Sequence, residues 1–430
     1  SARSFRQKLV RVPFDLDHPY WVEDADFDIE YHIRHIALPQ PGDWRQLCIQ
    51  VARLHARPMD LSKPLWEFTV VEGLNNIPGI PPGCFALVSK VHHAAIDGMS
   101  GVEMSAAIHD VTADMPDRPA DPDWQPEVPP GTADLLIRSY FNGLRQPLKY
   151  LEALGQSLPG VARLGRGVSA GELEIAGQRL APRTRFNAKV SSHRVFGVAF
   201  PLAEVRAIKD RIEGGTVNDV ILTIIGGGLR RYLEQRGELP ADSLTAMAPI
   251  SVRAEGEKKA MGNLVSAMVV ALGTHIADPM ERLDHVHREA ANSKALTNAV
   301  GARTLTDYSQ LIPSGLAGLG ARLYTRLGVA NAHAPVFNVV ATNVPGSRVP
   351  LYFVGAQMVK MMGLGPIFDS MGLINTIYSY GDEIAISFTS DRAMMPDPDV
   401  YADALRAAFA ELKAAAGAES KPARKKKAAA

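Results

Sequence analysis

The chain has 430 residues, which is long for a single hydrophobic core, so the sequence predicts two domains. Lys and Arg together number 46 and so do Asp and Glu, so no net charge draws the protein towards nucleic acid. Only two cysteines are present, which excludes a disulfide framework and zinc-binding spacings, and we expect a reducing, cytoplasmic compartment. The longest apolar run, residues 220–229, is well short of the ~20 residues of a membrane span.

The N-terminal part opens with extended, acid-rich sequence. A helix is predicted over residues 43–57, because Leu47, Val51 and Leu54 fall on one face. Strands are predicted over 64–74 and 84–93, with a Pro- and Gly-rich turn between them, followed by a helix over 99–109.

A run of prolines between residues 116 and 130 stops regular structure and marks a linker. An amphipathic helical stretch follows over 133–164, and a second lies at 311–329. The remaining predicted strands are 193–200, 244–250, 264–272, 336–343, 351–361, 372–380 and 383–391, and the remaining helices are 202–212, 217–235, 279–296 and 398–416.

This alternation, without a Gly-rich phosphate loop, predicts an α/β (α+β) protein with mixed sheets flanked by helices. We expect an N-terminal subdomain over 1–130, a helical linker over 131–189, a C-terminal subdomain over 190–416, and a disordered basic tail over 417–430. A tail of this composition either keeps the protein in solution or is weakly attracted to anionic lipid.

Two adjacent histidines, His92 and His93, follow the second strand, and Asp97 and Gly98 come shortly after them. A metal site is disfavoured because successive strand residues point to opposite faces and no further ligand completes a set. The alternatives are two structural histidines, or one base presented at the mouth of a cleft by a turn in which Gly98 frees the backbone.

The string HHAAIDG fits the HHxxxDG motif of chloramphenicol-acetyltransferase-like acyltransferases and condensation domains. The chain most resembles the bacterial wax ester synthase/acyl-CoA:diacylglycerol acyltransferases. The matching strings, in order, are KPLW (63–66), TVNDVILT (216–223), PISVR (249–253), MGNLVS (261–266) and NVPGS (343–347). The resemblance implies a two-domain acyltransferase fold with its active site at the domain interface. Members carry a further segment before the region at Phe5, so we expect a truncated or processed chain, and Ser347 departs mildly from the family pattern.

The resemblance implies that His93 is the general base and that Asp97 forms a structural ion pair, for which Arg253 is our candidate partner. An imidazole is suited to this role because it titrates near neutral pH. His92 is expected to support the loop. From the residues alone, Asp97 is equally compatible with a dyad that orients an imidazole.

No GxSxG elbow is present, so we expect direct attack within a ternary complex through a tetrahedral oxyanion. Asn218, Asn263 and Ser266 are candidate donors to that oxyanion. Asn218 and Asp219 are equally compatible with a capping pair at a helix start.

Two further motifs allow a structural or a substrate-binding reading. Pro64, Leu65 and Trp66 form either the buried start of a strand or a wall of the active-site cleft. Asn343, Pro345 and Gly346 are predicted to form a type II turn after a strand. The resemblance places that turn at the domain junction, where a crossover segment closes the substrate channel.

The implied reaction moves a long-chain fatty acyl group from acyl-CoA to diacylglycerol, and also to long-chain alcohols, without a metal or prosthetic group. An alternative is a relative that acylates a polyketide or glycolipid alcohol from a carrier protein. The expected partners are acyl-CoA, the lipid acceptor and the surface of an inner membrane or lipid droplet. The two amphipathic stretches are compatible either with packing between the domains or with contact to that lipid surface.

Overall fold

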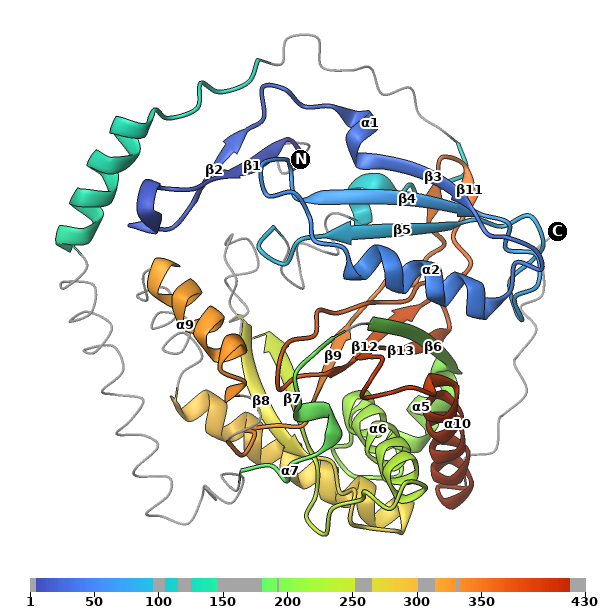
Figure 1. Ribbon diagram of the computed structural model, residues 1–430. Helices are drawn as coiled ribbons and strands as arrows, with labels where there is room; N and C mark the ends of the chain where they lie inside the picture. The colour runs from blue at the N-terminus through green and yellow to red at the C-terminus, as the bar shows by residue number, and fades with distance from the viewer. Residues whose placement is uncertain are drawn as a thin grey trace.

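The computed structural model describes residues 5–95, 105–114, 125–145, 180–191, 193–251, 265–300, 314–329 and 333–417. Two sheets organise this part of the chain, a small one from the N-terminal half and a larger one from the C-terminal half (Figure 1). The predicted mixed α/β class is confirmed, because both sheets contain parallel and antiparallel pairs.

The small sheet has the order β3-β4-β5. β3 (Ile33–Ala37) runs parallel to β4 (Trp66–Glu72), and β4 pairs with β5 (Ala86–Val91) in antiparallel register, so that Trp66 lies opposite Val91. A separate hairpin joins β1 (Gln7–Val10) to β2 (Tyr20–Glu23), with the short 3-10 helix η2 (Pro13–Asp15) at its turn. The opening segment is not wholly extended as predicted, because the Asp28 side chain caps a short helix, α1 (Ile29–His32).

Helix α2 (Trp44–Ala56) lies where the sequence predicts it and connects the two halves. It begins at a capping box in which the Asp43 side chain accepts from the Gln46 N–H, and Gln46 bonds back to the Asp43 N–H. Leu47, Ala52 and Leu54 are buried. The helix also packs against β6 (His193–Pro201) of the large sheet.

The large sheet has six strands in the order β6-β13-β12-β9-β7-β8. Its strands after β6 are β7 (Thr245–Ser251), β8 (Val265–Ala271), β9 (Val339–Val344), β12 (Leu373–Tyr380) and β13 (Glu383–Asp391). β12, β9 and β7 run parallel, and the remaining pairs are antiparallel.

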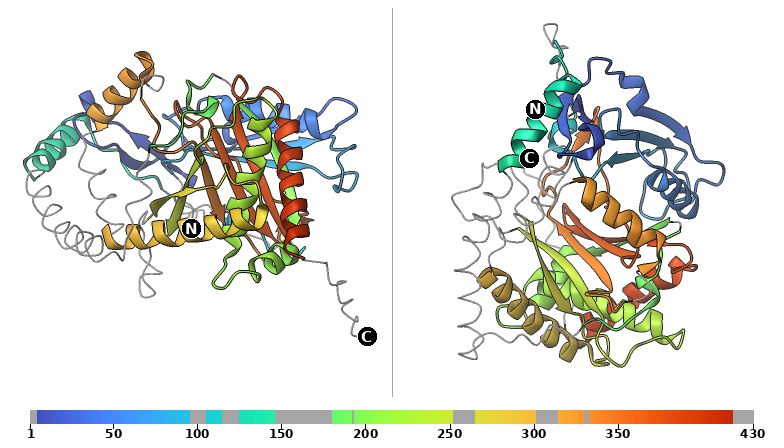
Figure 2. Two further views of the ribbon diagram at one scale, coloured as in Figure 1. Left: turned by 90° about the horizontal axis from the view of Figure 1, so that it is seen from below. Right: turned by 60° about the vertical axis from the view of Figure 1, so that its left-hand side comes forward.

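Four helices cover the face of the large sheet that points away from the small one (Figures 1 and 2). They are α5 (Leu202–Lys209), α6 (Val217–Glu234), α7 (Pro279–Val300) and α10 (Pro398–Ala415). The main core lies between these helices and the sheet and includes Tyr232, Phe388 and Tyr401, each fully buried. Gly228 lets α6 approach α10 closely, since an added Cβ would lie 2.7 Å from the Leu405 side chain.

The predicted strand over 351–361 is wrong in length. Only β10 (Tyr352–Phe353) and β11 (Ala356–Gln357) form there, as a small hairpin whose turn places Val354 and Gly355 at positive φ. The amphipathic stretches form helical residues 132–145 and α9 (Ser314–Arg326) within the described chain. The remaining parts of both stretches, and most of the predicted helix over 99–109, lie outside it.

Candidate active site at the end of β5

The two histidines lie in a tight turn directly after β5, and their side chains have different surroundings. The backbone N–H of His92 donates to the Leu65 carbonyl oxygen at 2.9 Å, and the Ala95 N–H donates to the His92 carbonyl oxygen at 2.9 Å. The Ala94 N–H donates to Nδ1 of His92 at 3.1 Å, so the His92 ring folds back on its own turn. The His93 side chain is exposed and is the one that reaches towards solvent.

The surroundings of His92 favour the neutral form of its ring. Burial lowers the pKa of His92 below its ordinary value, and the neighbouring His93 and Lys90 lower it further. Lys90 lies two residues earlier in β5, and its ammonium caps the C-terminus of α2 by donating to the carbonyl oxygens of Leu54 and Arg57. A neutral His92 retains an unprotonated Nδ1, which is what accepting the Ala94 N–H requires.

The PLW motif forms the buried start of β4, directly beside the histidine turn. Leu65 is 1% exposed and Trp66 is 4% exposed. The Trp66 indole stacks on the His32 ring with centroids 4.4 Å apart, and its Nε1–H donates to the Phe5 carbonyl oxygen at 2.7 Å. Because Leu65 also accepts the His92 N–H, this motif fixes where the histidine turn begins.

His32 is a residue that sequence reasoning missed. It is 1% exposed, stacks against the rings of Phe27 and Trp66, and donates from Nδ1 to the Trp66 carbonyl oxygen at 2.7 Å. No local pattern points to it, since its partner lies 34 residues away along the chain.

Asp219 acts as a capping residue at the start of α6. Its carboxylate accepts from the Thr216 N–H at 2.9 Å, and its own N–H donates to the Thr216 hydroxyl at 3.2 Å. Nδ1 of His287 in α7 also lies 2.9 Å from the same carboxylate oxygen. This geometry agrees with the capping alternative for Asp219, while the neighbouring Asn218 is partly exposed.

The NVPGS segment leads from β9 into a chain crossing between the two halves. The Gly346 N–H donates to the Ser379 hydroxyl at 3.1 Å, and an added Cβ at Gly346 would lie 1.9 Å from the Ser379 carbonyl oxygen. Gly346 does not have positive φ, so the predicted type II turn is wrong, and the glycine is needed for close approach instead. Asn343 and Pro345 are exposed.

This crossing reaches the N-terminal half at Tyr352. Tyr352 and Asp110 exchange two backbone hydrogen bonds, each of 2.8 Å. The Phe353 ring contacts Phe85 at the start of β5 and His109. Residues 110 and 352 therefore join the part of the chain that follows the histidine motif to the part that follows NVPGS.

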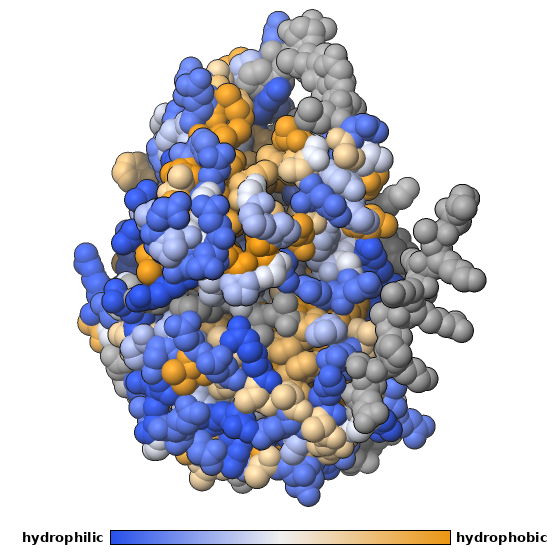
Figure 3. Space-filling view, turned by 90° about the vertical axis from the view of Figure 1, so that its right-hand side faces the viewer, coloured by the Kyte–Doolittle hydropathy of each residue, from blue (hydrophilic) through white to orange (hydrophobic). Residues whose placement is uncertain are grey.

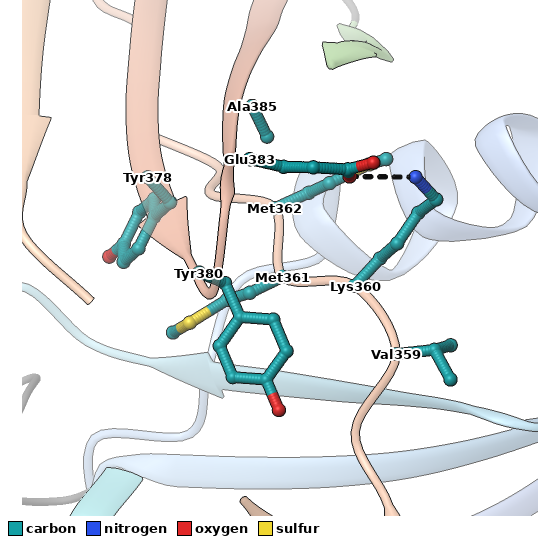
Figure 4. Close-up of a pocket in the computed structure, with 8 residues that line it drawn as sticks. All are labelled: Val359, Lys360, Met361, Met362, Tyr378, Tyr380, Glu383 and Ala385. Atoms are coloured by element: carbon teal, nitrogen blue, oxygen red, sulfur yellow. Dashed lines mark hydrogen bonds and ion pairs between the residues drawn. The ribbon is translucent and has the colours of Figure 1, made fainter. Parts of the chain in front are cut away.

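A shallow pocket lies along the same junction, beside strands of the N-terminal half (Figure 4). Tyr378 and Tyr380 from β12 line it, together with Met361 and Met362. Lys360 donates to Glu383 at 2.9 Å across its rim, and the Tyr380 hydroxyl donates to the Met358 carbonyl oxygen at 2.9 Å. None of the predicted site residues lines this pocket.

Several predicted site residues lie outside the described chain, namely Asp97, Gly98, Arg253 and Asn263. Ser266 belongs to β8 opposite Ile250, and only its backbone is described. Among the described residues, no three His, Cys, Asp or Glu side chains form a group that could hold a metal ion. No helix in the described segments has the length and apolar character needed to cross a bilayer.

The fold is found in other solved proteins. With one of them this chain shares the fold but little sequence. The cyclization-docking bidomain of a nonribosomal peptide synthetase from Sorangium cellulosum is 16% identical, with a TM-score of 0.50 over 96% of this chain and 75% of that one. Two joined α/β halves, each with a mixed sheet, define the fold class that this chain shares with it.

The family follows from closer similarities. The wax ester synthase/diacylglycerol acyltransferase catalytic domain matches residues 1–221, and the C-terminal domain of the same family matches residues 261–413. The chain therefore belongs to the wax ester synthase/diacylglycerol acyltransferase family. A protein of Mycobacterium tuberculosis that carries the name of a diacylglycerol O-acyltransferase is 34% identical, covering 97% of this chain and 89% of its own. The wax ester synthase/diacylglycerol acyltransferase of Marinobacter aquaeolei VT8 is 27% identical, with a TM-score of 0.64 over 96% of this chain and 86% of that one.

Proposed function

We propose that this acyltransferase moves a long-chain fatty acyl group from acyl-CoA to the free hydroxyl of diacylglycerol, forming triacylglycerol, and that it also accepts long-chain alcohols, forming wax esters. The family membership and the names of the relatives support the two substrate classes. The observation that carries the proposal is the exposed His93 at the end of β5, next to a His92 ring held by its own turn.

His93 is the general base of the proposed reaction. Its neutral imidazole takes the proton of the acceptor hydroxyl as the oxygen attacks the thioester carbonyl carbon. The resulting tetrahedral oxyanion collapses with cleavage of the carbon–sulfur bond. The imidazolium then returns its proton to the departing CoA thiolate, so the base is regenerated and the proton is balanced.

No metal or prosthetic group takes part in this mechanism. The thioester is already activated, so a base and hydrogen-bond donors to the oxyanion suffice. Asn218, Asn263 and Ser266 remain our candidates for those donors. Turnover that persists in EDTA would support the metal-free route, whereas loss of turnover on chelation and its recovery with a metal would contradict it.

Asp97 is proposed as a strut that pairs with Arg253 and joins the two halves, rather than as part of a dyad. A buried carboxylate requires a cationic partner, and removing one member of such a pair costs about 3–5 kcal/mol. Asp97→Ala and Arg253→Ala should therefore each lower the unfolding free energy, and the double variant should cost less than the sum. Additive losses would contradict the pair.

Both proposed acceptors are lipids, so we place the enzyme at the periphery of a membrane or lipid droplet facing the cytoplasm. The acyl chain would lie between the two halves, where it is shielded from water. This placement depends on the substrate assignment above.

The deciding experiment offers one acyl group in different forms. Purified protein is incubated with labelled palmitoyl-CoA and either diolein or hexadecanol, and in parallel with a palmitoyl carrier protein. Labelled triacylglycerol or wax ester from the CoA donor supports the proposal. Product from the carrier protein alone would favour the relative that acylates a polyketide or glycolipid alcohol, and His93→Ala provides the matched inactive control.

A further inference from the structure

The helix over residues 132–145 exposes its apolar residues to solvent instead of burying them. It meets the rest of the protein through Leu135 and Ser139, which are 4% and 6% exposed. The opposite face is apolar, and its members are Leu136, Ile137, Tyr140, Phe141 and Leu144, which are 36–65% exposed. A surface helix normally shows the reverse pattern, so this stripe is one that a partner would cover.

Helix α9 carries a second exposed apolar stripe of the same kind. Leu319 and Leu323 of the helix, and Leu327 directly after it, recur every fourth residue and are 52%, 46% and 74% exposed. Arg322 and Arg326 are exposed beside this stripe, and the helix contains no acidic residue.

The turn at η2 lies between these two helices. Phe14 is 90% exposed at φ 59°, and Leu16 is 58% exposed. A bulky residue adopts a left-handed φ only at an energetic cost. Exposing the Phe14 ring to water is a second unfavourable feature of this turn.

The three segments form one surface. Helix α9 packs against η2, and the Asn142 side chain of the first helix donates to Asp17 at 2.7 Å, just after η2. Both views of Figure 2 show the two helices on the same side of the molecule with the β1–β2 hairpin between them. We call residues 14–16, the outer face of 132–145 and the Leu stripe of α9 the docking surface.

The charges of the docking surface fit an anionic partner. Asp15 and Asp134 are each held by an arginine of the same segment, Arg11 at 2.6 Å and Arg138 at 3.0 Å. Arg145, Arg322 and Arg326 have no ion pair with any residue that the structure describes. Exposed leucines and aromatics bordered by unpaired arginines are typical of segments that lie in a lipid headgroup region.

Figure 3 views the opposite side of the molecule, where hydrophilic and hydrophobic residues are interspersed. The carboxyl end of β5, from which His93 follows, points towards the side that carries α9 and η2 (Figure 1). An acceptor lipid at the docking surface would thus be on the side from which the histidine turn is reached.

We infer that the docking surface inserts into the headgroup layer of an anionic phospholipid membrane and holds the enzyme there. Phe14, Phe141 and the α9 leucines enter the apolar boundary, and the arginines meet lipid phosphates. The inference builds on the lipid substrates proposed above, but lipid binding can be measured without turnover.

The test is flotation with vesicles of phosphatidylcholine containing phosphatidylglycerol, without substrate. Wild-type protein should bind these vesicles, bind phosphatidylcholine alone far more weakly, and dissociate with salt. The F141E/L323E variant should lose about tenfold or more of its partitioning, because each glutamate removes an inserted side chain and is repelled by the surface. V349E, which places a glutamate at a similarly exposed position after β9, should bind as wild type does.

Other variants separate the possible explanations. R322S/R326S should weaken binding and reduce its dependence on phosphatidylglycerol, and it tests the inference even if F141E/L323E fails to fold. H93A should bind vesicles normally, so that failure of catalysis and failure of docking are distinguished. The inference would be overturned if wild-type protein did not bind anionic vesicles, or if F141E/L323E bound them as wild type does. A dimer that F141E/L323E dissociates while vesicle binding persists would overturn it too and assign the surface to a second copy.

Discussion

The backbone N–H of His92 donates a 2.9 Å hydrogen bond to the carbonyl oxygen of Leu65, so the PLW and HHxxxDG motifs meet at the same point of the small sheet. Trp66, the next residue after Leu65, stacks on His32, and its Nε1–H donates a hydrogen bond to the Phe5 carbonyl oxygen. The histidine turn therefore rests on a buried aromatic cluster, and its position depends on how that cluster packs.

His93→Ala should reduce kcat by about 10²–10⁴-fold, because the acceptor hydroxyl loses its base. The exposed side chain has no packing role, so the unfolding free energy should stay within about 0.5 kcal/mol of wild type. Steady-state kinetics with palmitoyl-CoA and urea denaturation measure the two quantities. Activity close to wild type would end the general-base assignment.

His92 should titrate below its ordinary value of about 6.5, since burial lowers its pKa in the folded state. With a depressed folded pKa, the stability it contributes is present above the unfolded value and is lost as the pH falls through the folded value. NMR titration of the ring should show this midpoint, and the Ala94 amide should lose its hydrogen-bond shift over the same range.

Two substitutions at His92 distinguish the role of its Nδ1 as a hydrogen-bond acceptor from the role of its ring shape. His92→Asn keeps a short acceptor for the Ala94 N–H and should retain most of the activity. His92→Phe keeps an aromatic ring without the acceptor and should lower kcat by displacing the turn. Equal activity of both variants would show that the Nδ1 hydrogen bond has no positioning role.

Trp66→Ala should lower the unfolding free energy by about 3–5 kcal/mol, because it removes a large buried ring. It should also lower kcat by more than the loss of folded protein explains, since the start of β4 sets the position of His92. Trp66→Phe, which keeps a ring against His32 but loses the donor to Phe5 and part of the buried ring volume, is the matched control. If Trp66→Ala is as active as wild type per folded molecule, the two motifs are not coupled.

Asp219→Ala should cost about 0.5–2 kcal/mol through loss of the α6 cap, and more through loss of the His287 contact. His287→Ala should cost less, because the Thr216 cap remains. A double-mutant cycle by thermal unfolding measures the coupling, which should be about 0.5 kcal/mol or more. A coupling of zero would leave the cap as the sole role of Asp219.

Gly346→Ala should destabilise the protein by about 1–3 kcal/mol, because its Cβ would collide with the Ser379 carbonyl oxygen 1.9 Å away. The displaced crossing should also raise KM, since residues 345–352 lead to the pairing between Tyr352 and Asp110. Gly131→Ala, where nothing lies within 4 Å of an added Cβ, is the control and should be neutral. If the stability of Gly346→Ala were unchanged, β12 would have to shift to make room for the added Cβ.

Periodicity and turn residues determined most of the elements. Helix α2 begins after Asp43 as the amphipathic pattern and its cap require, and α6 begins after Thr216 for the same reason. The pattern failed where the chain does not follow a simple period. The stretch over 351–361 is apolar enough for a strand, but it crosses between the two halves and pairs with Asp110 instead of with a sheet neighbour.

The sequence by itself determined the class of chemistry, because HHxxxDG and the ordered motifs depend on residue identity and local spacing. Only the tertiary structure decided which contacts the residues of each motif make. It places Trp66 in the core, directs the Asp219 carboxylate to its own helix and to His287, and separates the held His92 from the exposed His93. It also places the two amphipathic helices on one surface with Phe14. Several of these assignments depend on contacts between residues 27 to more than 100 positions apart, and no local period or propensity encodes which distant residue will be the partner.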